Sequence, residues 1–108
     1  MLVETYPVSI RPAFRLNGQT AVIRLEPRFA AEYRQRFTQA TEEALKSREV
    51  RELQLDFTDV RYIDSCAMGL MMLLRRQAHG RRVSLVNCDN SVKNTLRDAH
   101  FGTLFAIS

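Results

Sequence analysis

The chain has 108 residues, 45% of them hydrophobic and 26% charged, and we expect residues 1–108 to form one globular domain that needs no metal or disulfide to fold. The net charge of +4 raises the question of a nucleic-acid partner, but the basic residues are scattered and have no aromatic residues among them, so we expect a solvated basic rim and no nucleic acid. The densest basic group flanks a predicted helix–strand turn and consists of Arg75, Arg76, Arg81 and Arg82.

The chain begins with a predicted β-hairpin. Apolar residues alternate with other residues over 8–15 and again over 21–26, which is the period of a strand with one buried face. Asn17 and Gly18 stand between the two segments, and this pair tolerates the positive φ of a type I′ turn. The sequence therefore predicts two antiparallel strands.

A helix is predicted next, from about Ala30 to Ser47. Apolar residues recur at steps of three and four, on one helical face: Phe29, Tyr33, Phe37, Ala40 and Ala44. Two i,i+4 pairs in the favourable order, Glu32–Arg36 and Glu42–Lys46, support this helix.

Two further strands and two further helices follow in alternation. Residues 52–57 and 83–86 alternate as strands do. A helix is expected from Ser65 to about Ala78, ended by Gly80. Asp89 or Asn90 can cap a third helix, whose apolar residues are Val92, Leu96 and Ala99. The apolar tail, residues 101–108, is too short to assign.

The strand patterns favour a sheet with one well-covered face. Parallel strands that are buried on both faces usually read as continuous apolar runs, whereas all four predicted strands alternate. Right-handed crossovers on a single face carry a sheet steadily in one direction. We therefore expect an α/β fold with a four-stranded mixed sheet in the order 1-2-3-4. Strand 1 is antiparallel to the rest, and three to four helices lie mainly on one face.

The segment from Asp56 to Leu70 runs from the end of a strand through a loop to the start of a helix. Asp64 or Ser65 can cap the free N–H groups of that helix, and its positive end suits an anion such as a phosphoryl group. Gly69 costs roughly 1 kcal/mol relative to Ala inside a helix, which indicates tight packing or a function. From these residues alone, a simple helix cap and a functional Ser65 both stay open.

The same segment resembles the STAS domain of bacterial anti-sigma factor antagonists. The family pattern is a strand that ends in Leu-x-Leu-Asp-Phe, then Val-x-x-Ile-Asp-Ser, then a small residue and Gly-Leu. The matching residues are Leu53, Leu55, Asp56, Phe57, Val60, Ile63, Asp64, Ser65, Ala67, Gly69 and Leu70. Residues 83–87, followed by Val92 and Leu96, are also similar to the family, and the order of elements matches over nearly the whole chain.

This resemblance implies a signalling switch that is not an enzyme. In the family, the serine directly after the aspartate is phosphorylated by a partner that is both a serine protein kinase and an anti-sigma factor; here that residue is Ser65. The unmodified protein binds the partner and frees the sigma factor, the phosphorylated form releases the partner, and a metal-dependent serine phosphatase resets it. Other STAS domains serve as adaptors in protein complexes without a phosphoserine cycle, and this alternative stays open.

The residues expected to contact the partner surround the phosphorylation site. They are Asp64, Ser65, Cys66, Met68, Gly69, Met72 and Arg28. Met68 and Met72 lie one helical turn apart and would form an adaptable docking patch, with a fully buried core role as the alternative. Residues 65–67 depart from the family's usual Ser-Ser-Gly or Ser-Thr-Gly, and residues 25–29 lack its usual Gly-x-Leu-Asp.

The cysteines and histidines form no recognisable catalytic or metal-binding pattern. Cys66 and Cys88 belong to no CxxC pair, so we expect reduced thiols. His79 lies near the far end of the predicted helix, roughly 20 Å from Cys66, and His100 follows the third helix. We expect no enzymatic activity, no cofactor and no metal.

No segment reads as a signal peptide or a membrane span. Residues 1–12 are too polar for a signal peptide. The longest run of apolar or small residues, 66–74, is far shorter than the roughly 20 residues that cross a bilayer. We therefore expect a cytoplasmic protein with no membrane partner, as a monomer or weak dimer.

Overall fold

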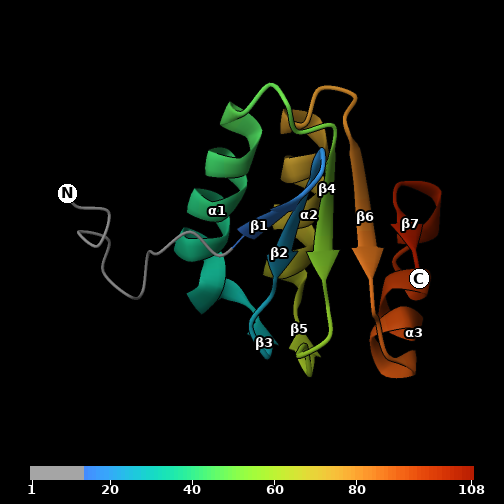
Figure 1. The fold of residues 1–108 in the computed structure, drawn as a ribbon. Helices are drawn as coiled ribbons and strands as arrows, with labels where there is room; N and C mark the ends of the chain where they lie inside the picture. Colours follow the sequence, from blue (N-terminus) through green and yellow to red (C-terminus); the bar gives the residue numbers. More distant parts are fainter. Residues whose placement is uncertain (1–13) are drawn as a thin grey trace.

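The computed structural model describes residues 14–108 (Figure 1). Residues 8–13 of the predicted first strand lie outside this range. In chain order the elements are β1 (Phe14–Asn17), β2 (Thr20–Arg24), β3 (Arg28–Phe29), the 3₁₀ turn η3 (Ala31–Tyr33), α1 (Arg34–Lys46), β4 (Glu52–Asp56), β5 (Tyr62–Ile63), α2 (Ser65–Gln77), β6 (Arg82–Val86), α3 (Asn90–Asp98), the 3₁₀ turn η4 (Phe101–Thr103) and β7 (Ala106–Ile107).

Five strands form the main sheet, in the order β1-β2-β4-β6-β7. β1 runs antiparallel to β2, and the other neighbouring pairs are parallel. The predicted α/β fold is confirmed, including the order of the four predicted strands and the antiparallel first strand. The strand count is corrected in two places: β7 extends the sheet beside β6, and β3 pairs with β5 in a separate two-stranded parallel sheet.

The hairpin turn differs from the expected one by a single residue. Asn17 pairs with Thr20 across the two strands, so Gly18 and Gln19 form the loop. Of these two, Gly18 has a positive φ, 65°, as the first central residue of a type II′ turn does. The predicted type I′ turn centred on Asn17 and Gly18 is therefore wrong.

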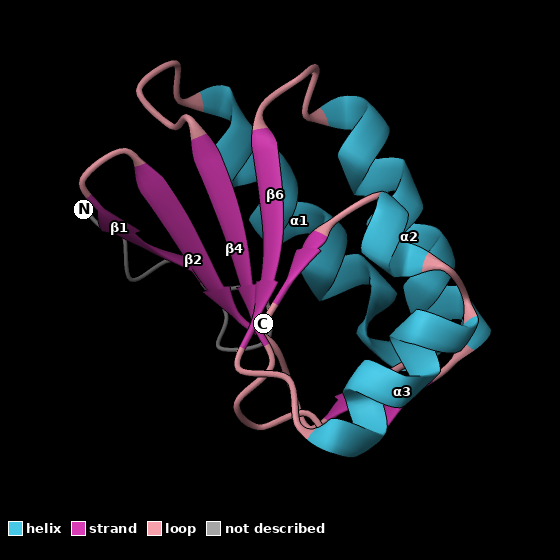
Figure 2. Cartoon of the chain, turned by 90° about the vertical axis from the view of Figure 1, so that its right-hand side faces the viewer, coloured by secondary structure: helices cyan, strands magenta, loops and turns pink. Residues whose placement is uncertain are grey.

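One face of the sheet carries the core. The strand register aligns apolar side chains in two rows that are buried on this face: Ala21, Leu53 and Val83, then Ile23, Leu55 and Leu85. Helices α1 and α2 lie on the same side of the sheet in Figure 2. The row between them faces the other way and consists of Val22, Gln54 and Ser84. This polar second face explains why the strand sequences alternate.

Helix α1 begins at Arg34, later than the predicted Ala30, because residues 28–33 first form β3 and η3. The apolar period across this boundary still marks buried residues, and the rings of Phe29 and Phe37 pack at a centroid distance of 5.1 Å. The helical spacing of apolar residues therefore extends back into residues 28–33, which form a short strand and a 3₁₀ turn, and for this reason the helix was predicted to begin too early.

The predicted ion pairs of α1 do not form. Arg36 Nη2 donates to Glu26 Oε1 at 2.7 Å, and Glu32 instead accepts from Arg28. Lys46 lies 3.7 Å from Glu43. The long charged side chains thus pair with other residues than predicted, although Arg28 and Glu32 keep the i,i+4 spacing with the arginine first. Such exposed pairs contribute little to stability.

Helices α2 and α3 are each capped by an aspartate. Asp64 Oδ1 accepts from the Ala67 N–H at 2.9 Å, and Asp89 Oδ1 accepts from the Val92 N–H at 2.8 Å. The sequence allowed either Asp64 or Ser65 to cap α2 and either Asp89 or Asn90 to cap α3. In both helices the aspartate is the cap.

The ends of these helices differ in two details from the prediction. After α2, the left-handed backbone falls first on His79, with a φ of 51°, and then on Gly80, with a φ of 88°. Ala99, expected on the apolar face of α3, is its exposed C-cap residue. No helix within residues 14–108 is long and apolar enough to cross a membrane.

Candidate functional site

The carboxylate of Asp56, the last residue of β4, fixes the start of the loop that leads to Ser65. Its Oδ1 accepts from the Thr58 N–H at 2.9 Å, from Thr58 Oγ1 at 2.5 Å and from Asn87 Nδ2 at 3.0 Å. Burial acts to raise the pKa of Asp56, but the hydrogen bonds from Thr58 and Asn87 outweigh it and hold the pKa below its usual value. One oxygen therefore joins the carboxyl ends of β4 and β6.

The short β3–β5 pair brings two distant parts of the chain together. The Pro27 carbonyl accepts from the N–H groups of Arg61 and Tyr62, at 2.8 and 3.2 Å. Arg28 then pairs with Tyr62 in the parallel register. The loop before α1 thus lies directly beside the segment that precedes α2.

Ser65 is the first residue of α2 and is exposed. Asp64, in extended conformation at φ −119°, supplies the cap, so the Ser65 hydroxyl is not needed for that role. The Ser65 side chain forms no hydrogen bond with any other residue in the range 14–108. The hydroxyl therefore stands free at the positive end of a 13-residue helix.

Arg28 lies at the same end of the molecule. Its guanidinium binds Glu32 and lies 4.3 Å from the centroid of the Tyr62 ring. The hydrogen bond and charge of Glu32 raise the pKa of Arg28, and the nearby Asp64 carboxylate adds to this effect. The fold therefore brings two expected partner-contact residues, Arg28 and Asp64, within electrostatic range of each other.

The outer face of α2 continues this surface. Met72 is 42% exposed and Leu73 is 45% exposed, whereas Met68 is half-buried and packs against the core. Among the residues that the structure describes, a Cβ placed on Gly69 would have no neighbour outside its own helix backbone within 4 Å, so packing against these residues does not explain this glycine. Neither methionine is fully buried, and the docking interpretation of Met68 and Met72 stays a prediction.

Two exposed apolar residues of this surface were missed from the sequence. Leu73 adjoins Met72 on α2, and Tyr62 in β5 is 45% exposed. Residues 66–74 are apolar all round, which is typical of a buried helix, so their sequence did not predict that Leu73 is exposed. The position of Tyr62 was not predictable either, because it depends on the β3–β5 pairing.

Asp59 is neutralised by an arginine of β2. Arg24 Nε and Nη2 donate to its two carboxylate oxygens at 2.9 and 3.1 Å. This bidentate contact lowers the pKa of Asp59 and raises that of Arg24. Asp64 forms no ion pair with any residue of the described range 14–108, so it is the carboxylate that contributes negative charge next to Ser65.

The remaining candidate groups lie apart. Cys88 is buried, and burial raises the pKa of its thiol to about 11, so it is a poor nucleophile. Cys66, half-buried in the first turn of α2, and His79, beyond its end, are separated by the length of the helix. Residues 14–108 contain no group of three metal-ligating side chains.

Three features together define the STAS class of α/β domains. They are a mixed sheet with an antiparallel first strand, two helices on one face of that sheet, and a serine at the start of α2, directly after the aspartate that caps this helix. The chain belongs to the STAS-domain family, since the family model described as "Mlab, STAS domain" matches residues 13–106.

Similar proteins agree with this assignment. A STAS-domain containing protein of Pseudomonas aeruginosa is 34% identical over 94 residues, which cover 85% of this chain and 91% of that protein. A Thermotoga maritima protein, described provisionally as an anti-sigma factor antagonist, has a similar fold with a TM-score of 0.77 and 16% identity, over 87% of this chain and 82% of that one.

The anti-sigma factor antagonist SpoIIAA also has this fold, in two forms. Its unphosphorylated form has a TM-score of 0.66 at 20% identity, over 89% of this chain and 87% of that one. The phosphorylated form, described as a Bacillus cell fate determinant, has a TM-score of 0.65 at 19% identity, and the match covers 89% of this chain and 91% of that one. At these identities the likeness establishes the fold.

Proposed function

We propose that this chain is an anti-sigma factor antagonist, a non-enzymatic cytoplasmic switch controlled by phosphorylation of Ser65. Unphosphorylated, it binds an anti-sigma factor that is also a serine kinase. Phosphorylated, it releases that partner, and a metal-dependent serine phosphatase restores the hydroxyl. The protein works through its STAS domain, as a monomer or weak dimer and without a cofactor.

The exposure of Ser65 carries this proposal. A kinase can reach the hydroxyl without unfolding α2, because Asp64 and not Ser65 caps the helix. The likeness to SpoIIAA, solved in unphosphorylated and phosphorylated forms, supports the same kind of switch.

Electrostatics provides the mechanism of release. A phosphoryl group adds about −1.5 to −2 charges at neutral pH. In the free domain the N-terminal end of α2 offsets part of this charge. A partner surface shaped for a neutral hydroxyl would have to bury the dianion beside Asp64, which is costly. Phosphorylation therefore weakens the complex and leaves the fold intact.

The surface that binds the partner surrounds Ser65. It is formed by Asp64, Cys66, Met68, Gly69 and Met72 from the start and outer face of α2, and by Arg28 from β3. The flexible thioethers can adapt to the partner. Gly69, with open space above it, lets the partner's backbone approach the helix closely.

A titration of variants with the candidate kinase tests this proposal. Ser65→Ala keeps the partner affinity, whereas Ser65→Asp lowers it by more than about tenfold, because a like charge placed against an interface costs several kcal/mol. Isothermal titration calorimetry measures both affinities. Equal affinities for the two variants would contradict the mechanism.

Ser91 provides a matched control. It is exposed in the first turn of α3, a helix that is also capped by an aspartate, Asp89. Ser91→Asp therefore adds the same charge to the same kind of helix start. We expect it to leave partner binding unchanged.

The exposed apolar face of α2 favours a second candidate function, that of an adaptor subunit held permanently in a protein complex. Met72 and Leu73 can be buried by a partner whether or not Ser65 is phosphorylated. In that case Leu73→Ser abolishes binding, while Ser65→Ala and Ser65→Asp both retain it.

A further inference from the structure

Three of the four arginines that the sequence predicted to form a solvated rim, Arg75, Arg81 and Arg82, line a cavity. The cavity has a volume of about 360 Å³ and lies between the end of α2, β6 and the chain around β7. Its lining includes Arg75, Arg81, Arg82, Gly80 and Leu104. We call it the arginine pocket. Its size falls within the range of small-molecule sites.

Two of the three guanidinium groups are held in place by backbone carbonyls. Arg75 Nε donates to the Leu104 carbonyl at 3.1 Å, and Arg81 Nη1 donates to the Ser47 carbonyl at 3.3 Å. Each contact uses one of the five N–H donors of an arginine. The other donors stay available in groups whose positions are already restricted, which lowers the entropic cost of binding a ligand.

Acidic residues do little to neutralise this pocket. Arg82 Nε lies 3.7 Å from Glu52 Oε2 and also donates to Ser84 Oγ at 3.3 Å. Within residues 14–108, neither Arg75 nor Arg81 forms an ion pair, whereas Arg24, Arg28 and Arg36 all do. Three arginines thus line the pocket, and the one carboxylate near them, that of Glu52, is 3.7 Å from Arg82.

The dipole of α2 explains only part of this cluster. Basic residues in the last turn, here Arg75 and Arg76, commonly balance the negative end of a helix. Arg81 and Arg82 lie beyond the helix, after a turn in which His79 and Gly80 both have left-handed backbone. This turn returns the chain so that Arg81 and Arg82 line the cavity together with Arg75.

We propose that the arginine pocket binds the phosphate group of a small molecule. Three arginines that line one cavity suit a tetrahedral anion with several acceptor oxygens, because a guanidinium group can donate two parallel hydrogen bonds. The pocket is separated from Ser65 by the length of α2, about 20 Å. It is therefore distinct from the proposed switch and does not depend on it.

Amide chemical shifts measured during titration of the full chain with inorganic pyrophosphate test the proposal. We expect saturable shifts at Gly80, Arg81 and Leu104, which sodium chloride at equal ionic strength does not produce. Glycerol phosphate serves as a second probe and distinguishes an esterified phosphate from a free one. Shifts that grow linearly and equally with chloride would overturn the proposal.

Variants locate the binding. Arg81→Gln should weaken pyrophosphate binding by about tenfold or more, since it removes a charge-assisted hydrogen-bond donor. Arg81→Lys retains the charge but loses the fork, so we expect an intermediate loss. This second variant keeps the test valid if the glutamine variant fails to fold.

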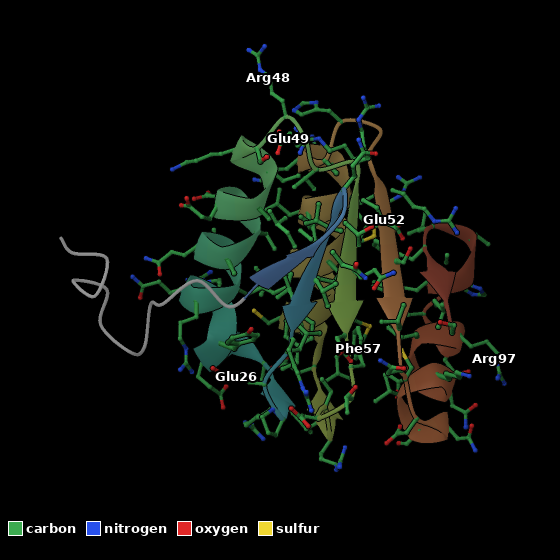
Figure 3. All side chains as sticks on the ribbon, viewed as in Figure 1. Glu26, Arg48, Glu49, Glu52, Phe57 and Arg97 are labelled. Atoms are coloured by element: carbon green, nitrogen blue, oxygen red, sulfur yellow. The ribbon has the colours of Figure 1, made fainter. Side chains whose placement is uncertain are left out.

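Arg97→Gln is the matched control. Arg97 lies on α3 (Figure 3) and lines a different cavity, together with Lys93 and His100. The proposal predicts unchanged binding for this variant. Equal losses for Arg81→Gln and Arg97→Gln, or binding of a single-stranded oligonucleotide only, would indicate a diffuse basic surface and overturn it.

Discussion

Asp56 shows how one buried carboxylate can fix the start of the loop that leads to Ser65. Its three hydrogen bonds come from the residue two positions ahead and from Asn87, which follows the neighbouring strand. Asn87 has a left-handed φ of 60°, a conformation that asparagine tolerates better than most residues. The family pattern includes this aspartate, and the structure gives it a stabilising role.

Replacing Asp56 should destabilise the protein. Asp56→Ala leaves the amide of Asn87 and the N–H of Thr58 without their acceptor, and we expect a loss of about 2–3 kcal/mol in the free energy of unfolding. Urea denaturation measures this loss. Asp59→Ala is the control, and it should change stability little because its partner Arg24 is on the surface.

The same carboxylate predicts a pH dependence. The folded pKa of Asp56 lies below its usual value, so its contribution is fully present above the unfolded pKa of about 4 and is lost as the pH falls through the folded pKa. The stability difference between the wild type and Asp56→Ala should therefore narrow under acidic conditions. A difference that widens with acid would contradict this account.

The caps of α2 and α3 allow stability to be separated from binding. Both aspartates accept one backbone hydrogen bond in the same position of their helix. Asp64→Ala and Asp89→Ala should each cost about 1 kcal/mol, measured by urea denaturation. Only Asp64→Ala should also change partner affinity, because Asp64 adjoins Ser65. Equal effects of the two variants on binding would show that the aspartate acts through helix stability alone.

Regular elements were predictable, whereas two-residue strands were not. Alternation and helical spacing identified β2, β4, β6 and the three helices, because each presents a repeated apolar face to one core. β3, β5 and β7 contain two residues each, too few to show a period. β7 forms because Ser84 and Leu85 of β6 offer an unpaired edge, which only the folded sheet reveals.

In the candidate site, too, local features were predictable from the sequence and contacts between distant segments were not. Ser65 and its cap are local features of one segment, so the sequence predicted their place at the start of a helix. The approach of Arg28 to Asp64 depends on the β3–β5 pairing, and the arginine pocket depends on Leu104 and Ala106 returning beside α2. The spacing of residues along the sequence does not predict such contacts between distant segments.

At the scale of the whole molecule, we propose different roles for the two ends of α2. The N-terminal end carries Ser65 beside the aspartate and the adaptable apolar face. The C-terminal end carries the arginine pocket. Between these two ends, α2 packs on the core face of the sheet (Figures 1 and 2). A charge added at Ser65 can therefore alter one surface without disturbing the other.

Incubation of the protein with ATP and its candidate kinase, followed by peptide mapping and a measurement of the remaining complex, tests the proposed switch most directly. The account predicts one phosphoryl group on the peptide that contains Ser65, none on the Ser65→Ala variant, and dissociation of the kinase as the modification proceeds. A complex that persists with Ser65 fully phosphorylated, or a partner that never modifies Ser65, would contradict it.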